Sequence, residues 1–208
     1  PIYCSAATKA LCEVLLPDSG RLQEEEAEYA NRKGSSKHAP ALPLYDEAQA
    51  RECIKQMHPV EFLAGFEALP GLRASLHAEG HLLGAAGVLL ASTAGAVYFS
   101  GDVGRPNDPV LLPPSPPPGS DWLVVESTYG NRSHPDEDTR SALAQVLRRV
   151  LARGGVVVVP AFAVGRAQAL LHLVAQLFES DEVPTVPLYL NSPMAAQVTG
   201  LYRRFPTL

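Results

Sequence analysis

The chain has 208 residues, of which 46% are hydrophobic and 19% are charged, and its formal net charge is −5. This composition excludes a wholly disordered chain, and the negative charge excludes nucleic-acid binding through overall charge alone. Hydrophobic runs such as residues 155–159 are too short to cross a bilayer, so no membrane association is expected.

The cysteines and the basic residues narrow the class of protein further. Cys4, Cys12 and Cys53 are odd in number and lack CxxC spacing. This pattern favours reduced thiols in a cytoplasmic protein over a disulfide framework or a cysteine zinc site. The 13 arginines outnumber the 4 lysines. Arginine suits bidentate contacts with phosphate, although ordinary solvated surface positions account for most of these residues.

The first part of the chain predicts helices. Ser5 is a suitable N-cap for a helix through Leu16, and the PDSG sequence at residues 17–20 predicts a break. A second, acidic helix is expected over residues 21–33, with Gly34 as its C-terminal cap.

The hydrophobic pattern changes after a third helix, which is expected between Asp46 as its cap and about Gln56. Short β segments separated by glycines are predicted at residues 60–63, 72–77, 87–91 and 96–99. A proline-rich loop over residues 112–120 follows, and its stiffness makes it a natural seam between two units.

Strands and helices alternate after this seam. Strands are predicted at residues 122–125, 156–159 and 187–190, and helices at about 139–153, at 165–178 and finally through Arg204. This order predicts a parallel sheet with helices on its faces.

Five short motifs follow one another along the chain, each joining a predicted strand to a polar or glycine-rich turn. They are GHLLGAA at residues 80–86, SGD at 100–102, ESTYG at 126–130, PAFAVGR at 160–166 and NSPMA at 191–195. Turns of this kind are where α/β folds place their reactive groups. The series resembles the β-CASP branch of the metallo-β-lactamase fold, the zinc-dependent RNA-processing nucleases.

The resemblance implies an α/β fold: a partial metallo-β-lactamase αββα sandwich followed by the first part of a β-CASP parallel α/β insertion domain. Residues 1–120 would be the C-terminal part of the metallo-β-lactamase-like domain, and residues 121–208 the N-terminal part of the β-CASP domain. The family's His-x-His-x-Asp-His metal loop is absent from this sequence. The chain is therefore expected to be an internal fragment that is inactive alone.

His81 and Asp102 are the candidate metal ligands. Dinuclear zinc hydrolases need histidine nitrogens and a carboxylate that bridges the two ions. The two residues lie 21 positions apart, enough for two strands that return to one edge of a sheet. The resemblance implies that His81 binds one zinc and that Asp102, also a catalytic residue, bridges both. Glu79 stands where the family often has alanine. Taken alone, His81 would more often be a hydrogen-bonding turn residue, and Asp102 a turn cap.

Glu126, Arg132 and His134 are candidate residues of the β-CASP region. Glu126 ends a predicted strand, and the resemblance gives it a catalytic role in which it orients a histidine near the scissile phosphate. Arg132 and His134 stand where the family carries a similar Arg-x-His pair, which could contact RNA phosphate. Pairing with the nearby Asp136 or Glu137 is the structural alternative.

Three further residues are candidate phosphate contacts at predicted helix starts. The unit at residues 160–166 presents a helix N-terminus, whose free N–H groups and dipole attract an anion. An RNA phosphate at Gly165, with Arg166 as a charged helper, is expected there. Ser192 begins the last helix, and simple helix capping also explains this residue.

The resemblance thus implies a cytoplasmic hydrolase, a ribonuclease that cleaves RNA phosphodiester bonds through a dinuclear zinc centre and binds single-stranded RNA. One alternative is a catalytically inactive RNA-binding or assembly subunit with the same fold. Another is a small-molecule metallo-hydrolase, which would explain His81 and Asp102 but not the ESTYG and PAFAVGR motifs. The sequence leaves the oligomeric state open, a homo-oligomer included.

Overall fold

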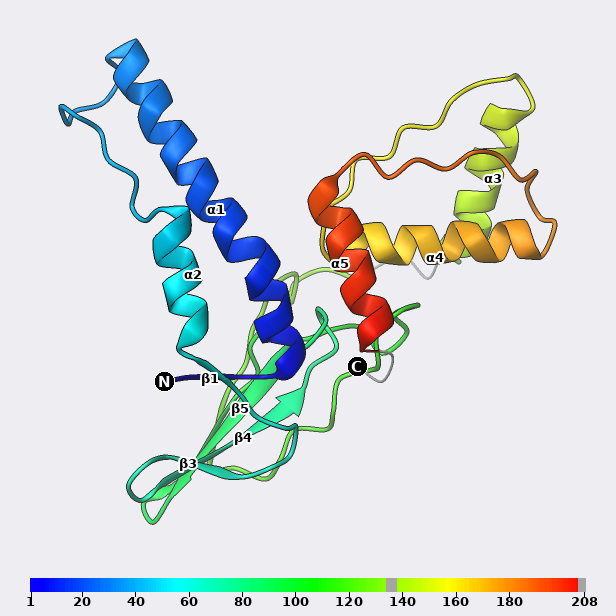
Figure 1. Ribbon diagram of the computed structural model, residues 1–208. Helices are drawn as coiled ribbons and strands as arrows, with labels where there is room; N and C mark the ends of the chain where they lie inside the picture. The colour runs from blue at the N-terminus through cyan, green and yellow to red at the C-terminus, as the bar shows by residue number, and fades with distance from the viewer. Residues whose placement is uncertain (134–137, 206–208) are drawn as a thin grey trace.

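A computed structural model of the chain describes residues 1–133 and 138–205 (Figure 1). In chain order the elements are β1 (Ile2–Cys4), α1 (Ala6–Lys33), α2 (Glu47–Lys55), β2 (Met57–Pro59), β3 (Phe66–Leu69), β4 (Leu72–Ala78), β5 (Ala86–Ser92), β6 (Gly95–Phe99), β7 (Trp122–Val124), α3 (Thr139–Leu151), α4 (Arg166–Glu179) and α5 (Pro193–Arg204). Within the described part of the chain, no helix is both long enough and apolar enough to cross a membrane.

The main sheet has five strands in the order β3-β4-β5-β6-β7. Neighbouring strands are antiparallel from β3 to β6, and β7 runs parallel to β6. The carboxyl ends of β4, β6 and β7 therefore share one edge of the sheet. A separate parallel pair joins β1 to β2 beside the start of α1. The protein is thus a mixed α/β structure with parallel and antiparallel pairing, which is consistent with a metallo-β-lactamase-type fold.

The strands predicted at residues 72–77, 87–91, 96–99 and 122–125 are confirmed as β4, β5, β6 and β7. The strand predicted at residues 60–63 is wrong. Pairing with β1 selects Met57–Pro59 instead, and Phe62 makes only an isolated bridge to Leu76. Strand β3 was not predicted, because its four residues lack a clear alternation of apolar and polar side chains.

The predicted break between two N-terminal helices is wrong, since α1 continues through Pro17 to Lys33. Both predicted caps are confirmed: the Ser5 side chain accepts from the Thr8 N–H at 3.1 Å, and Gly34 ends the helix with a φ of 62°. Packing overrides the local break signal, because Gly20 lets the backbone at the start of α2 approach α1. A Cβ at Gly20 would lie 2.7 Å from the Asp46 carbonyl.

The predicted helices after the seam are confirmed as α3, α4 and α5, whereas the strands predicted at residues 156–159 and 187–190 are wrong. Both segments are exposed connections beside the helices (Figure 1). Val156 and Val158 are each 85% exposed and Tyr189 is 86% exposed. A strand needs a hydrogen-bonded neighbour, and the described residues supply none here, so the expected parallel sheet is not formed.

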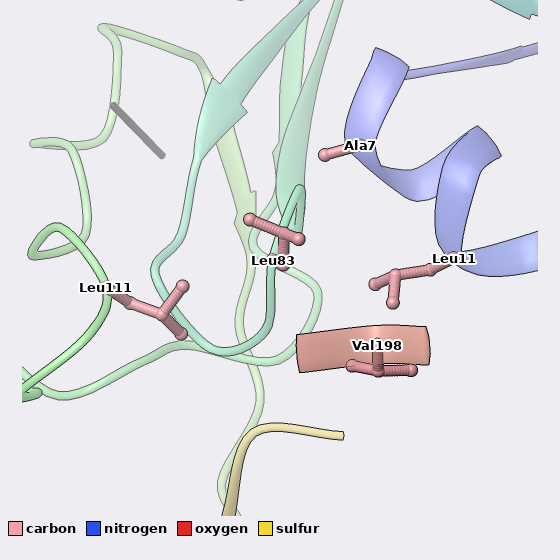
Figure 2. Close-up of a cluster of buried hydrophobic side chains, with 5 residues drawn as sticks. All are labelled: Ala7, Leu11, Leu83, Leu111 and Val198. Atoms are coloured by element: carbon pink, nitrogen blue, oxygen red, sulfur yellow. The ribbon is translucent and has the colours of Figure 1, made fainter. Parts of the chain in front are cut away.

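One buried cluster joins α1, the loop after β4, the loop after β6, and α5 (Figure 2). Its members are Ala7, Leu11, Leu83, Leu111 and Val198, and each is less than 10% exposed. Leu83 lies at the centre of the view, with the α1 side chains on one side and Val198 of α5 on another. The loop that carries His81 is therefore part of the hydrophobic core.

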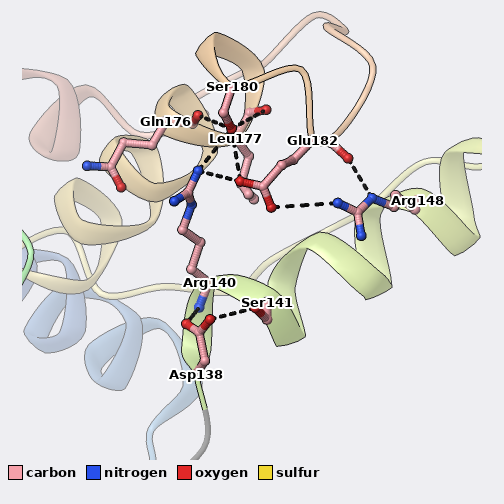
Figure 3. Close-up of polar contacts among 8 residues, drawn as sticks. All are labelled: Asp138, Arg140, Ser141, Arg148, Gln176, Leu177, Ser180 and Glu182. Atoms are coloured by element: carbon pink, nitrogen blue, oxygen red, sulfur yellow. Dashed lines mark hydrogen bonds and ion pairs between the residues drawn. The ribbon is translucent and has the colours of Figure 1, made fainter.

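A smaller cluster packs α3 against α4, and a polar network closes it at one end (Figure 3). Glu182 is the centre of this network. Its carboxylate accepts from Arg140, its backbone carbonyl accepts from Arg148, and Arg148 Nη2 lies 3.6 Å from Glu182 Oε2. Two arginines of α3 thus converge on one carboxylate after α4.

We expect Glu182→Ala to lower the free energy of unfolding by about 1 kcal/mol, because both arginines lose the same partner. The effect stays small because these side chains are 35–50% exposed and partly screened by solvent. Urea unfolding measures it, with the exposed Glu179→Ala as the matched control. The difference between the two variants should shrink at high salt. An equal effect of both substitutions would contradict this role for Glu182.

Candidate functional site

The site lies at the edge where β4, β6 and β7 end. His81 follows β4, Asp102 follows β6, and Glu126 follows β7. Because β4 and β6 both run antiparallel to β5, and β7 runs parallel to β6, all three side chains reach the same edge. The structure therefore brings together the three residues that the sequence predicts as metal-binding and catalytic.

His81 and Asp102 face one another across this edge. His81 Nε2 lies 3.9 Å from Asp102 Oδ2, and the two side chains are 44% and 73% exposed. Zinc binds imidazole nitrogen and carboxylate oxygen at about 2.0–2.2 Å with tetrahedral angles, so two donors of one ion lie about 3.4 Å apart. The donor types suit a shared ion, and the observed separation is longer than this spacing, so the two exposed side chains would move closer together on binding it. Among the described residues, no group of three or more His, Cys, Asp or Glu side chains converges as a metal site.

Glu126 is fixed next to the Asp102 loop. Its Oε1 accepts from the Val103 N–H at 2.6 Å, and its own N–H donates to Ser100 Oγ at 3.2 Å. The pKa of Glu126 is lowered, first by the Val103 hydrogen bond, then by the Thr128 hydroxyl, with a smaller contribution from His81. This carboxyl is thus kept ionised, as a hydrogen-bond acceptor at neutral pH.

The loop between β4 and β5 holds His81 through its backbone. The Ala85 N–H donates to the Leu82 carbonyl at 2.9 Å, which closes a turn over residues 82–85, directly after His81. The hydroxyls of Ser5 and Thr8 both donate to the Gly84 carbonyl, at 2.8 and 2.9 Å. The cap of α1 therefore also anchors the candidate metal loop. This second role of Ser5 was not predicted from the sequence, because it joins residues far apart in the chain.

The predicted phosphate contacts that lie among the described residues are exposed or have other partners. Arg132 lies over the Tyr129 ring at 5.6 Å, and His134 is outside the described residues. Arg166 is exposed at the start of α4, and the Ser192 side chain caps α5 by accepting from the Ala195 N–H. Across residues 1–133 and 138–205, no hydrogen bond or ion pair joins Arg132, Arg166 or Ser192 to His81, Asp102 or Glu126.

The start of α4 does approach the His81 loop. A Cβ atom added at Gly165 would lie 3.0 Å from the Cδ2 atom of Leu82, and Leu82 is the residue after His81. The N–H groups of Arg166 and Ala167 donate to the carbonyls of Val164 and Phe162. Two of the N–H groups expected to be free for an anion are thus paired within the chain, which leaves the Arg166 side chain as the clearer anion partner at this helix start.

Comparison of the sequence with those of known proteins identifies the family of the chain. No protein-family model matches the chain. It is 32% identical over 205 residues to "Ribonuclease TTHA0252" of Thermus thermophilus, and the match covers 98% of the chain and 43% of that protein. The chain belongs to the β-CASP metallo-β-lactamase family.

Other members of the β-CASP family match over the same extent of the chain. "Endoribonuclease YSH1" of Mycosarcoma maydis is 29% identical over 207 residues, covering 98% of the chain and 22% of its own length. "Cleavage and polyadenylation specificity factor 73" of Drosophila melanogaster is 26% identical over 206 residues, covering 98% and 28%. The chain spans less than half the length of these relatives.

Proposed function

We propose that this chain supplies part of the active site of a zinc-dependent ribonuclease that hydrolyses RNA phosphodiester bonds. The observation that carries the proposal is the convergence of His81, Asp102 and Glu126 at one sheet edge. The names of the relatives support RNA as the substrate. Residues 1–120 would belong to the metallo-β-lactamase-like domain and residues 121–208 to the start of the β-CASP domain, in a cytoplasmic protein.

His81 and Asp102 are the proposed zinc ligands, with Asp102 shared between two ions. Bound zinc would supply the Lewis acidity that activates water at neutral pH. The chain's own contribution is orientation: antiparallel pairing and the anchored loop keep an imidazole and a carboxylate side by side at one sheet edge. Both side chains are exposed, so an RNA phosphate could reach them from solvent.

Glu126 is proposed to act as an orienting acceptor. The Val103 N–H and the Thr128 hydroxyl hold its carboxylate and lower its pKa. An ionised, fixed carboxylate can orient an imidazole N–H that donates to it, and so keep that imidazole in one tautomer. The exposed Arg132 and Arg166 side chains would offset the charge of a single-stranded RNA backbone.

The test is RNA cleavage by the natural gene product that contains this chain, supplied with zinc. We expect His81→Ala to lower cleavage by at least about 100-fold, since even groups that only support metal ligands contribute 10–100-fold. His38→Ala is the matched control, because His38 lies on an exposed loop. Cleavage that survives His81→Ala would refute the proposed role.

The 208-residue chain on its own gives a second comparison. We expect it to be inactive, because the described residues provide one histidine and one aspartate rather than a complete ligand set. Zinc-dependent cleavage by this chain would show instead that the site is complete within it. Zinc-independent RNA binding without cleavage by the natural gene product would favour an RNA-binding or assembly subunit.

A further inference from the structure

A buried carboxylate lies directly beneath the candidate metal loop. Glu79, two residues before His81, is only 3% exposed, and Tyr98 of β6 is 1% exposed. The Tyr98 hydroxyl donates a short hydrogen bond to Glu79 Oε1. A buried carboxylate is costly unless it is hydrogen-bonded, so Glu79 depends on this partner. Burial and the Glu79 carboxylate together raise the pKa of Tyr98, which stays a hydroxyl donor.

The backbone of Glu79 joins the two loops of the site. Its N–H donates to the Ala85 carbonyl at 3.0 Å, which closes the base of the His81 loop. Its carbonyl accepts from the Gly104 N–H at 2.7 Å, two residues after Asp102. Glu79 is therefore attached to the loop of each proposed ligand, and its side chain is attached to β6, the strand that leads into the Asp102 loop.

The surrounding residues leave space for this pair and hold it. A Cβ at Gly87 would lie 2.0 Å from the Tyr98 hydroxyl and 2.6 Å from Glu79 Oε1, so only glycine fits there. The His77 ring meets the Tyr98 ring edge-on at 5.6 Å, and His77 Nε2 lies 3.1 Å from Ser75 Oγ. Burial lowers the pKa of His77, which keeps this neighbour uncharged. The pair is thus built into the sheet.

We infer that Glu79 and Tyr98 are positioning residues, whose hydrogen bond fixes the His81 loop relative to Asp102. This inference rests on the proposed function, in which these two residues share a metal ion. Without the bond, the loop would keep its hydrophobic anchor at Leu83 but lose its polar attachment to β6.

The test measures the protection of the loop amides against hydrogen exchange, and the zinc affinity, in the natural gene product. We expect Tyr98→Phe to speed hydrogen–deuterium exchange of a peptide over residues 79–86 about tenfold, and to weaken zinc binding about tenfold. A peptide within α3 should exchange unchanged. Tyr29→Phe is the matched control, since Tyr29 is 55% exposed on α1. Glu79→Gln as a single substitution keeps an acceptor for the Tyr98 hydroxyl, so it should retain most of the protection against exchange.

A double variant separates positioning from stability. Glu79→Met with Tyr98→Phe removes both polar partners, so it should fold even where Tyr98→Phe does not. We expect it to recover thermal stability but not zinc affinity. Wild-type zinc affinity in the double variant, or unchanged exchange in Tyr98→Phe, would overturn the inference. Failure of the proposed function looks different: His81→Ala would then bind zinc as tightly as the wild type.

Discussion

Gly104→Ala is expected to destabilise the protein by about 3 kcal/mol and to displace the loop that carries His81. A Cβ at position 104 would lie 2.1 Å from both the carbonyl carbon and the oxygen of Gly80, and 2.6 Å from the His81 N–H nitrogen. These are backbone atoms, which cannot rotate away as the end of a side chain can. Gly104 is not among the glycines with positive φ, so the whole effect comes from this close approach.

Urea unfolding followed by circular dichroism measures the loss. Gly200→Ala is the matched control, because a Cβ there meets nothing within 4 Å inside α5. It should raise the free energy of unfolding by about 1 kcal/mol, the ordinary gain of alanine over glycine in a helix. Equal stability of Gly104→Ala and the wild type would mean that the Asp102 and His81 loops do not approach in solution as described.

Features decided by neighbouring residues were predictable from the sequence. Ser5 and Gly34 cap α1 as predicted, and Asp46 caps α2 with a capping box in which Gln49 returns a hydrogen bond. Each of these caps depends on hydrogen bonds between groups no more than four residues apart in the chain. Pro17 shows the limit of such signals: its break was outweighed by α2, which packs against Gly20 from 26 residues further along.

The two wrong strand predictions after the seam concern a feature that distant residues decide. The segments at residues 156–159 and 187–190 have the β-branched and aromatic composition of buried strands. A strand forms only where another backbone satisfies its N–H and C=O groups, and local composition carries no information about such a partner. Residues 122–125 have a similar composition, and there β6 supplies the partner.

The candidate site was predictable as far as strand ends could be located. His81, Asp102 and Glu126 each follow a correctly predicted strand, and antiparallel or parallel pairing then places them at one edge. The bond between Glu79 and Tyr98 was not predictable, because it crosses from one strand to another over 19 residues.

Leu83→Ala is expected to lower the free energy of unfolding by about 3 kcal/mol, in the middle of the range for leucine in a packed core. Leu83 is 1% exposed and packs with Ala7 and Leu11 of α1, with Leu111, and with Val198 of α5 (Figure 2). Truncation leaves a cavity that rigid helices on two sides cannot fill. Leu44→Ala is the matched control, because Leu44 is 86% exposed and should change stability by less than about 0.5 kcal/mol.

The same substitution tests whether the core holds the candidate site. Leu83 lies two residues after His81, so a cavity there should also loosen the loop and speed amide exchange over residues 79–86. The Glu79–Tyr98 hydrogen bond holds the loop at Glu79, which precedes His81 in the chain. Tyr98→Phe and Leu83→Ala should therefore both loosen this loop, but only Leu83→Ala should also loosen α5 through Val198. Exchange in α5 that is unchanged by Leu83→Ala would show that the helix is held independently of the metal loop.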